Sequence, residues 1–121
     1  MSGRRKTLSY RTGVTGEARA AAYLESLGMR CAAQRWRGGG GEIDLIMEDG
    51  ETLVFVEVKY RPAAPAGEGL LAVTADKRRR MVRAASAYLA EVQGFDCPVR
   101  FDVVEITAAG LRHVPDAFRP G

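Results

Sequence analysis

Residues 41–59 decide the fold, because two apolar runs flank a turn signal in the stretch GEIDLIMEDGETLVFVEVK. The runs at 42–47 and 52–60 are rich in Ile, Val, Leu and Phe, which is typical of buried strands. The Asp49-Gly50 pair between them favours a two-residue hairpin turn. Acids and one lysine interrupt both runs, and charged side chains are costly to bury unless something pairs with them. A bound divalent cation together with a phosphate would provide that pairing.

The turn predicts a register for the hairpin and therefore a face for each charged side chain. With this turn Asp44 would lie opposite Phe55. Glu42 would lie opposite Glu57, a like-charge pair that is destabilising without a cation or base nearby. Because side chains alternate faces, one side of the sheet would carry Glu42, Asp44, Glu57 and Lys59. Asp44 and Glu57 would then be diagonal neighbours, with backbones about 7–8 Å apart, and could hold one cation between them.

Upstream of the hairpin the sequence predicts a basic arm and a helix. Residues 1–12 are polar and basic without a periodic pattern, which predicts a flexible arm. Thr15 is the predicted N-cap of a helix that runs to Leu27 and stops at Gly28. Glu17 falls on or beside the apolar stripe of this helix. It is therefore either a first-turn acid that interacts with the helix dipole or a member of a site.

Downstream of the hairpin the sequence predicts a loop and a second helix. Residues 61–69 are rich in Pro, Ala and Gly, which predicts an exposed loop that is either a substrate flap or a connector. Thr74 is the predicted cap of a helix that ends at Gly94 and carries an apolar stripe from Met81 to Val92. The first turns of this helix are basic.

The order of the elements predicts the fold class. A weaker strand at 29–36 precedes the hairpin, and a strand at 99–106 follows the second helix, with a further short strand at 111–114. A strand, a helix and a strand in this order predict a crossover to a parallel neighbour. We therefore expect an α/β fold, with a mixed central sheet flanked by helices in the order αβββαβ. Residues 13–115 would form one domain and 116–121 a C-terminal tail.

The composition is typical of one globular domain. With 121 residues, of which 46% are hydrophobic and 27% charged, the chain is long enough to bury a core without disulfides or metals. No apolar run approaches the ~20 residues of a membrane span, and the N-terminus lacks the apolar stretch of a signal peptide. We expect a cytoplasmic protein without a membrane partner. Cys31 and Cys97 are far apart in no C-x-x-C arrangement, which argues against a zinc site or a disulfide framework.

The charge distribution favours a nucleic-acid partner. The net charge is only +3, but residues 42–57 hold six acids and no base, whereas 77–83 hold five bases and no acid. Four further bases, Arg4, Arg5, Lys6 and Arg11, lie in the predicted arm. An acidic centre between basic flanks suits a phosphodiester, which needs a cation at the reacting group and neutralisation along its backbone. The alternative is two solvated faces.

The residue types indicate the chemistry. Acids without accompanying His or Cys make an oxygen-rich site suited to Mg²⁺ or Mn²⁺. Lys59 shares a face with Glu57 and could orient an attacking water and stabilise negative charge on phosphorus. No nucleophilic Ser–His or Cys–His pair is evident, and the single histidine, His113, is interpreted as a surface or edge residue.

Several motifs resemble the YraN-like family of uncharacterised bacterial proteins. They are Glu17, GEIDLI at 41–46, FVEVK at 55–59 with Arg61, AVT at 72–74 with Lys77, and RFDVV at 100–104. That family is similar to archaeal Holliday junction resolvases of the restriction endonuclease-like superfamily, whose motif is an Asp followed on the next strand by Glu-x-Lys. The resemblance runs from about Gly13 to Ile106. It departs at Tyr60, where a threonine is usual, and at Gln34-Arg35-Trp36, where an asparagine is expected before the tryptophan.

The resemblance implies a restriction endonuclease-like core and a role for each matching residue. Asp44 and Glu57 would be metal ligands, Lys59 the catalytic lysine and Glu17 an accessory acid near the metal. We therefore expect a metal-dependent endonuclease that hydrolyses DNA phosphodiesters at branched or flapped structures. The predicted nucleic-acid contacts are Arg61, Lys77, Arg79, Arg80 and Arg83.

Two other interpretations remain open from the sequence. One is a non-catalytic nucleic-acid-binding module on a nuclease-like fold, which would need the same basic helix and arm. The other is an interaction domain whose strand acids pair with Lys59 and Arg61. A two-fold homodimer would suit a symmetric junction, although no segment marks an interface.

Overall fold

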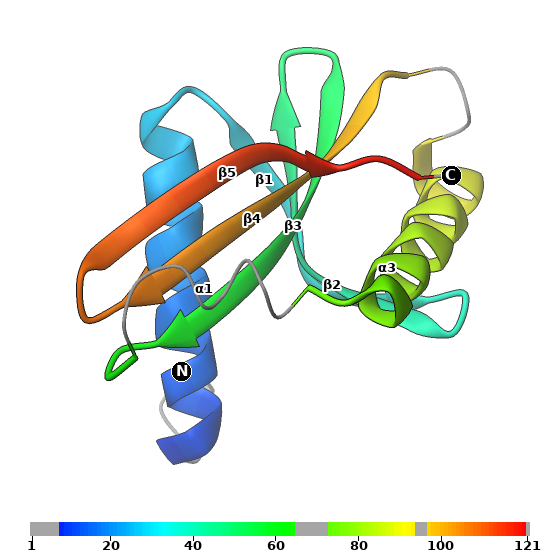
Figure 1. Cartoon of the computed structure of the whole chain (residues 1–121). Coiled ribbons are helices and arrows are strands. Elements are labelled where there is room, and N and C mark those ends of the chain that lie inside the picture. Colours follow the sequence, from blue (N-terminus) through cyan, green and yellow to red (C-terminus); the bar gives the residue numbers. More distant parts are fainter. Residues whose placement is uncertain (1–7, 65–72, 94–96, 121) are drawn as a thin grey trace.

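The structure is a computed structural model that describes residues 8–64, 73–93 and 97–120 (Figure 1). Its elements are α1 (Leu8–Ser26), β1 (Arg30–Gly38), β2 (Gly41–Asp49), β3 (Thr52–Arg61), α3 (Ala75–Tyr88) with the π-helical turn η2 (Leu89–Gln93), β4 (Val99–Thr107) and β5 (Gly110–Phe118). The strands form one five-stranded sheet in the order β1-β2-β3-β4-β5. β3 and β4 are parallel and the other neighbours are antiparallel. The predicted α/β class and the parallel crossover are confirmed.

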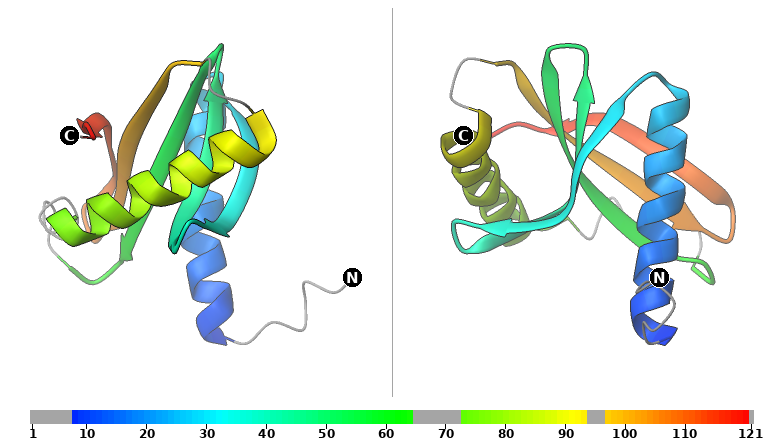
Figure 2. Two further views of the ribbon diagram at one scale, coloured as in Figure 1. Left: turned by 90° about the vertical axis from the view of Figure 1, so that its right-hand side faces the viewer. Right: turned by 180° about the vertical axis from the view of Figure 1, so that it is seen from behind.

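One helix covers each face of the sheet, as the views in Figures 1 and 2 show. Leu24 of α1 belongs to the same buried cluster as Val56 of β3. Met81 of α3 belongs to the cluster of Phe55, the preceding residue of that strand. Neighbouring residues of a strand point to opposite faces, so β3 contributes to both cores. The predicted stripe of the second helix is buried at Met81 and through Tyr88, but Val92 at its end is 56% exposed.

The first helix is longer than the sequence predicted. α1 begins at Leu8, so Thr15 lies inside the helix and its prediction as N-cap is wrong. Residues 8–12 of the predicted arm are therefore helical, whereas residues 1–7 lie outside the described residues. The Ser, Thr and Gly residues between 9 and 16 have weak helix propensity and favour caps, so local sequence placed the start too late.

The second helix begins where the sequence predicted. The Thr74 hydroxyl accepts a hydrogen bond from the backbone N–H of Lys77 at 3.2 Å, which confirms Thr74 as the N-cap of α3. The predicted stop at Gly94 lies outside the described residues. Most of the predicted loop at 61–69 also lies outside the described residues. Of this segment, Arg61 is the last residue of β3, and the described residues end at 64.

The last strand is also longer than predicted. β5 runs past 114 to Phe118, so the order is αβββαββ and residues 116–118 of the predicted tail belong to the sheet. The predicted strand ended at 114, directly before Pro115. An edge strand tolerates proline because one side of its backbone is unpaired. The register of β4 and β5 shifts at this point, and Asp116 has a φ of 53°, so the proline lies in a bulge.

The β2–β3 hairpin turns one residue later than predicted. Asp49 lies opposite Thr52, so Gly50 and Glu51 are the central pair of the turn. Gly50 has a φ of 62° at the first central position, where type II′ hairpin turns carry glycine. Asp49 stays in the ladder, and its carboxylate accepts a 3.1 Å hydrogen bond from Arg100 of β4. This tertiary contact is not visible in the local turn signal.

The later turn changes the pairing but not the faces. Phe55 lies opposite Ile46, which is two residues further along β2 than its predicted partner Asp44. The β2–β3 ladder ends at the Leu45–Val56 pair, so the predicted pairing of Glu42 with Glu57 is also wrong, and the partner that Glu42 has is Arg37 of β1. A register shift of two residues leaves every side chain on its own face, because the side-chain period of a strand is two.

Candidate functional site

β2 and β3 separate at the residue where the acids begin. The ladder between them ends at the pair of Leu45 and Val56, and Asp44 is the next residue toward the start of β2. Asp44 Oδ2 accepts a hydrogen bond from the backbone N–H of Val58 at 2.8 Å. The first residues of β2 instead approach α3 so closely that a side chain at Gly41 would collide with the carbonyl oxygen of Arg80. The side chain of Asp44 thus lies in the opening between two separating strands.

Glu57 of β3 is the most deeply buried acid at this opening, with 3% of its surface exposed. Lys59 Nζ lies 3.2 Å from its Oε2, and Lys77 Nζ of α3 lies 3.5 Å from its Oε1. The second contact is an ion pair without hydrogen-bond geometry, since Glu57 Oε1 has no hydrogen-bond partner among the described residues. Buried carboxylate oxygens are normally satisfied, so this oxygen is an exception that a ligand would explain.

Glu57 lies close enough to Asp44 for its charge to affect the ionisation of Asp44. Burial first, and then the negative charge of Glu57, raise the pKa of Asp44 to about 7, against the hydrogen bond from Val58 and the charge of Lys77. Two neighbouring carboxylates are hard to ionise together in a buried site. A divalent cation between them would reverse this repulsion.

Glu17 approaches the same opening from α1. α1 packs tightly on β3 here, because a side chain at Gly16 would stand 2.8 Å from Tyr60 Cβ. Glu17 is 8% exposed, and its Oε1 accepts a 2.9 Å hydrogen bond from Arg35 Nε. Burial raises the pKa of Glu17, Arg35 lowers it, and the nearby charges of Glu42 and Glu57 raise it again. Glu17 is therefore near the acidic pair, but its carboxylate is bound to Arg35.

Sequence reasoning did not assign a role to Arg35. It lies within β1 with a φ of 52°, a left-handed conformation that is uncommon for residues other than glycine and asparagine. The available signal was the departure before Trp36, where an asparagine was expected. Asparagine would suit this left-handed backbone conformation. In this protein the position holds Arg35, whose side chain contacts Glu17.

The donor set fits a hard divalent cation held by two carboxylates. Asp44 and Glu57 supply oxygen ligands, which Mg²⁺ and Mn²⁺ prefer, and Mg²⁺ in proteins often takes only one or two carboxylates and keeps waters. Within residues 8–64, 73–93 and 97–120 no three Asp, Glu, His or Cys side chains converge on one point. The unsatisfied Glu57 Oε1 and the effect of the Glu57 charge on Asp44 are the features that fit a cation.

The five predicted nucleic-acid contacts fall into separate places. Lys77 and Arg80 line a groove of about 400 Å³ between α3 and the β1–β2 hairpin, together with Arg37 and Glu42. Lys77 also contacts Glu57, so this groove adjoins the acidic pair. Arg80 is 51% exposed and pairs with Asp76 one turn earlier in α3.

Arg79 and Arg83 point to another side of α3. They line a groove of about 470 Å³ near the end of β5, where Arg78 stacks on the Phe118 ring at 5.5 Å. Arg61 is exposed at the end of β3. The basic run at 77–83 thus divides between two surfaces, as expected for a helix with 3.6 residues per turn.

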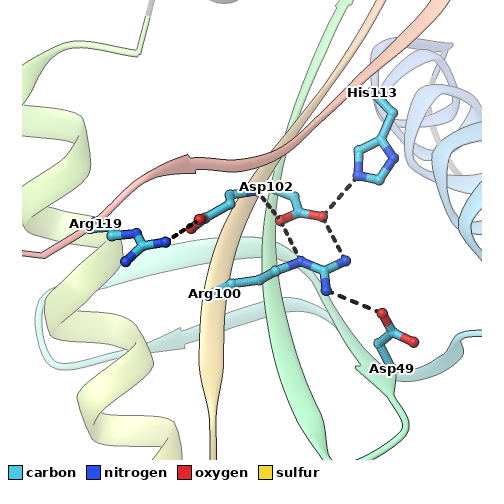
Figure 3. Close-up of polar contacts among 6 residues, drawn as sticks. Asp49, Arg100, Asp102, His113 and Arg119 are labelled. Carbon is cyan, nitrogen blue, oxygen red and sulfur yellow. Dashed lines mark hydrogen bonds and ion pairs between the residues drawn. The ribbon is translucent and has the colours of Figure 1, made fainter.

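A second buried acid lies on β4 with a complete set of partners (Figure 3). The two oxygens of Asp102 accept hydrogen bonds from Arg100 Nε at 3.0 Å and Nη2 at 3.3 Å. Its Oδ1 also accepts the Asp116 backbone N–H at 2.9 Å, and its Oδ2 lies 2.8 Å from His113 Nε2. Arg100 further donates to Asp49, and these hydrogen bonds raise its pKa. The cluster ties β4 to the bulge of β5 and to the β2–β3 turn.

His113 belongs to this structural cluster. It lies on the edge strand β5, which fits its interpretation as a surface or edge residue, although its side chain is only 8% exposed. Its ring packs edge-on against Tyr23 of α1, with centroids 5.6 Å apart. The sequence did contain a signal for the Arg100–Asp102 contact, because two residues that are two positions apart on a strand have their side chains on one face.

Fold and site together define a mixed α/β domain with an acidic pair where β2 and β3 separate. The chain belongs to Uncharacterised protein family UPF0102, whose profile matches residues 16–106. This confirms the resemblance to the YraN-like family.

Relatives in several bacteria match most of the chain. A UPF0102 protein of Nitratidesulfovibrio vulgaris is 47% identical over 111 residues, which cover 88% of this chain and 83% of the relative. UPF0102 protein GSU0650 of Geobacter sulfurreducens is 46% identical, with coverage of 88% and 87%. UPF0102 protein STH1475 of Symbiobacterium thermophilum is 50% identical over 99 residues, with coverage of 82% and 84%. The names of these relatives state no activity. Of the residues that the structure describes, none forms a helix long and apolar enough to cross a membrane.

Proposed function

We propose that this protein is a Mg²⁺- or Mn²⁺-dependent endonuclease with a restriction endonuclease-like core, and that it hydrolyses phosphodiesters of branched or flapped DNA. The observation that supports this most is the state of Glu57. It is buried, one of its oxygens has no hydrogen-bond partner among the described residues, and its charge opposes the ionisation of the nearby Asp44. An arrangement that costs stability is typical of a functional site.

Each residue of the site has a chemical role in this proposal. Asp44 and Glu57 would hold the cation, which when bound neutralises charge on a phosphodiester and lowers the pKa of water. Lys59 is 18% exposed, so its ammonium can contact Glu57 and still donate to an attacking water or a phosphate oxygen. Glu57 would orient Lys59 for that task through their 3.2 Å ion pair.

Lys77 would connect the acidic pair to the path of the nucleic acid. Its ammonium lies 3.5 Å from Glu57 and lines the groove between α3 and the β1–β2 hairpin. Arg37 and Arg80 line the same groove and present guanidinium groups that can bind phosphate bidentately. The phosphates flanking the reacting phosphodiester would therefore lie along this groove.

The test is cleavage by purified protein of linear, flapped and four-way DNA with Mg²⁺, with Mn²⁺ or with EDTA. Wild-type protein should cleave only with a divalent cation. Glu57→Gln and Lys59→Met should each reduce the rate by about 10²–10³-fold, as losses of charge-stabilising groups do. Glu51→Gln is the matched control, because Glu51 is an exposed acid in the turn of the same hairpin.

Two results would contradict the endonuclease. Cleavage that persists at the wild-type rate in both site variants would come from a contaminant or from other residues. Absence of cleavage with either cation on all three substrates, by protein that binds the DNA, would favour the binding-module interpretation.

The binding module has a specific observation in its favour. Lys59 and Lys77 lie on either side of Glu57, so two ammonium groups can balance its charge without a cation. If that is their role, Glu57→Gln should leave or raise DNA affinity, and calorimetric titration with Mn²⁺ should give no heat of binding. Heat of binding in the wild type that Glu57→Gln abolishes would reject the module.

If DNA lies along the groove between α3 and the β1–β2 hairpin, the arginines of α3 should differ in their effect on DNA affinity. Arg80→Gln should weaken binding and lower the slope of log K against log salt by about 1, as the loss of one phosphate contact does. Arg83→Gln removes the same charge from the same helix, but from the other groove, and should leave the slope nearly unchanged. An equal decrease in both variants would place the DNA across both grooves.

A further inference from the structure

Arg35 occupies an unusual position beside the acidic pair. The β1–β2 ladder pairs Gln34 with Leu45 and Trp36 with Ile43, so Arg35 lies level with Asp44 on the neighbouring strand. Its φ of 52° is unfavourable for an arginine and is found within a strand. Strained residues persist where the surrounding contacts determine them, and they gather at functional sites.

The contact that this conformation permits is with Glu17. Arg35 Nε donates to Glu17 Oε1 at 2.9 Å, with the acid buried and the arginine side chain 37% exposed. Glu17 is close enough to raise the pKa of Asp44, and Glu57 in turn raises that of Glu17. A third carboxylate is therefore present at the site, but a guanidinium holds it.

We propose that Arg35 is a positioning residue that withholds Glu17 from the Asp44–Glu57 pair and so lowers the affinity of that pair for a divalent cation. The inference rests on the proposed metal role of Asp44 and Glu57. Affinity of carboxylate sites depends on the number of charged ligands. With Glu17 bound to Arg35, the pair offers two carboxylates, and no third acid converges on them among the described residues.

The position also provides a variant that releases Glu17 without straining the backbone. Asparagine tolerates a left-handed φ, so Arg35→Asn should fold and relieve strain. Its side chain is too short to replace the guanidinium. A glutamate so released lies in a field of other acids, where a cation is its most favourable partner.

The test is calorimetric titration of Mn²⁺ into the full chain without DNA. Arg35→Asn should bind Mn²⁺ about tenfold more tightly than wild type, the size of effect that partners of metal ligands have. Glu17→Gln alone should change the affinity by less than the Arg35→Asn gain. In the Arg35→Asn/Glu17→Gln double variant the gain should disappear.

A charge control separates ligation from a change in the general field. Arg30→Asn removes a positive charge and an ion pair with Glu48 from the other end of β1, and it should leave Mn²⁺ affinity near the wild-type value. The gain in Arg35→Asn should also persist in 0.5 M KCl, because salt screens distant charges more than a direct ligand. Thermal denaturation of each variant establishes that it is folded.

The outcomes distinguish this inference from the proposed function. Unchanged or weaker Mn²⁺ binding in folded Arg35→Asn, when wild type binds, would overturn the positioning role and leave the metal pair intact. A gain that survives in the double variant would overturn it as well. Absence of binding in both wild type and Arg35→Asn would overturn the metal pair itself.

Discussion

Two buried acids on neighbouring strands of this protein have opposite surroundings. Asp102 of β4 is fully buried and Glu57 of β3 is 3% exposed, so burial does not distinguish them. The oxygens of Asp102 accept hydrogen bonds from Arg100, His113 and the bulge of β5, whereas Glu57 Oε1 accepts none among the described residues. The two acids therefore differ in the completeness of their hydrogen bonding, which is full for Asp102 and leaves one oxygen of Glu57 unsatisfied among the described residues.

The origin of the partners explains the difference. Asp102 is held by Arg100, two residues away on its own strand, and by an edge strand whose bulge it fixes. The neighbours of Glu57 are another acid, Asp44, and the ammonium groups of two lysines, which can move to other partners. We infer that Asp102 contributes stability and that the Asp44–Glu57 pair costs stability in the absence of a ligand.

The largest expected effect is on the Asp102 cluster. Asp102→Asn keeps the shape of the side chain but turns an amide toward the donors of Arg100. Removing one partner of a buried ion pair costs about 3–5 kcal/mol, and we expect a loss of that size in the free energy of unfolding. Urea denaturation monitored by circular dichroism measures it.

Asp49→Asn is the matched control for this comparison. Asp49 contacts the same arginine at 3.1 Å, but its side chain is 42% exposed. Exposed ion pairs contribute about 0–1 kcal/mol, so the control should be nearly neutral. A loss below 1 kcal/mol for Asp102→Asn as well would mean that the complete hydrogen bonding of Asp102 does not stabilise the fold.

A smaller effect of opposite sign is expected for Asp44→Asn in the metal-free protein. Asparagine can still accept the Val58 hydrogen bond but carries no charge to repel Glu57. At pH 8 in EDTA the variant should be more stable than wild type, by on the order of 2–4 kcal/mol. Urea denaturation in parallel with Asp102→Asn makes the two acids directly comparable.

The sign of the pH dependence follows from the direction of the pKa change. Folding raises the pKa of Asp44 from 3.8 to about 7, so between these values the folded state holds a proton that the unfolded chain has released. The free energy of unfolding therefore falls as the pH rises through this window. The advantage of Asp44→Asn should be small at pH 4 and grow until about pH 7. An advantage that does not change with pH would show that charge repulsion is not its cause.

The sequence predicts most of the architecture because strand faces depend on local alternation. Glu57 and Lys59 were predicted to share a face, and their side chains lie 3.2 Å apart even though the turn was placed one residue early. The error in register came from a turn signal that a tertiary contact overrode, because Asp49 binds Arg100 and stays in the ladder. The helix start was placed too late because the Ser, Thr and Gly residues before Glu17 favour caps, whereas α1 begins at Leu8.

The partners of the buried acids could not be predicted in the same way. Arg35 reaches Glu17 across 18 positions of the chain, and it does so through a backbone conformation that its residue type disfavours. Arg100 reaches Asp49 across 51 positions. Such contacts depend on how separate elements pack, which neither periodicity nor spacing within one element encodes.

The smallest expected effect is the stabilisation of the folded protein by a bound cation. If Asp44 and Glu57 bind a cation, Mn²⁺ at ten times its dissociation constant should stabilise the wild-type protein by about 1.4 kcal/mol, because only the folded state binds it. Thermal denaturation with and without Mn²⁺ measures this gain. Asp44→Asn should lose the gain, since one of two ligands is gone, whereas Asp49→Asn should keep it, since that acid belongs to the Arg100 network. Stabilisation that is equal in Asp44→Asn would place the cation elsewhere, and the unsatisfied oxygen of Glu57 would then need another explanation.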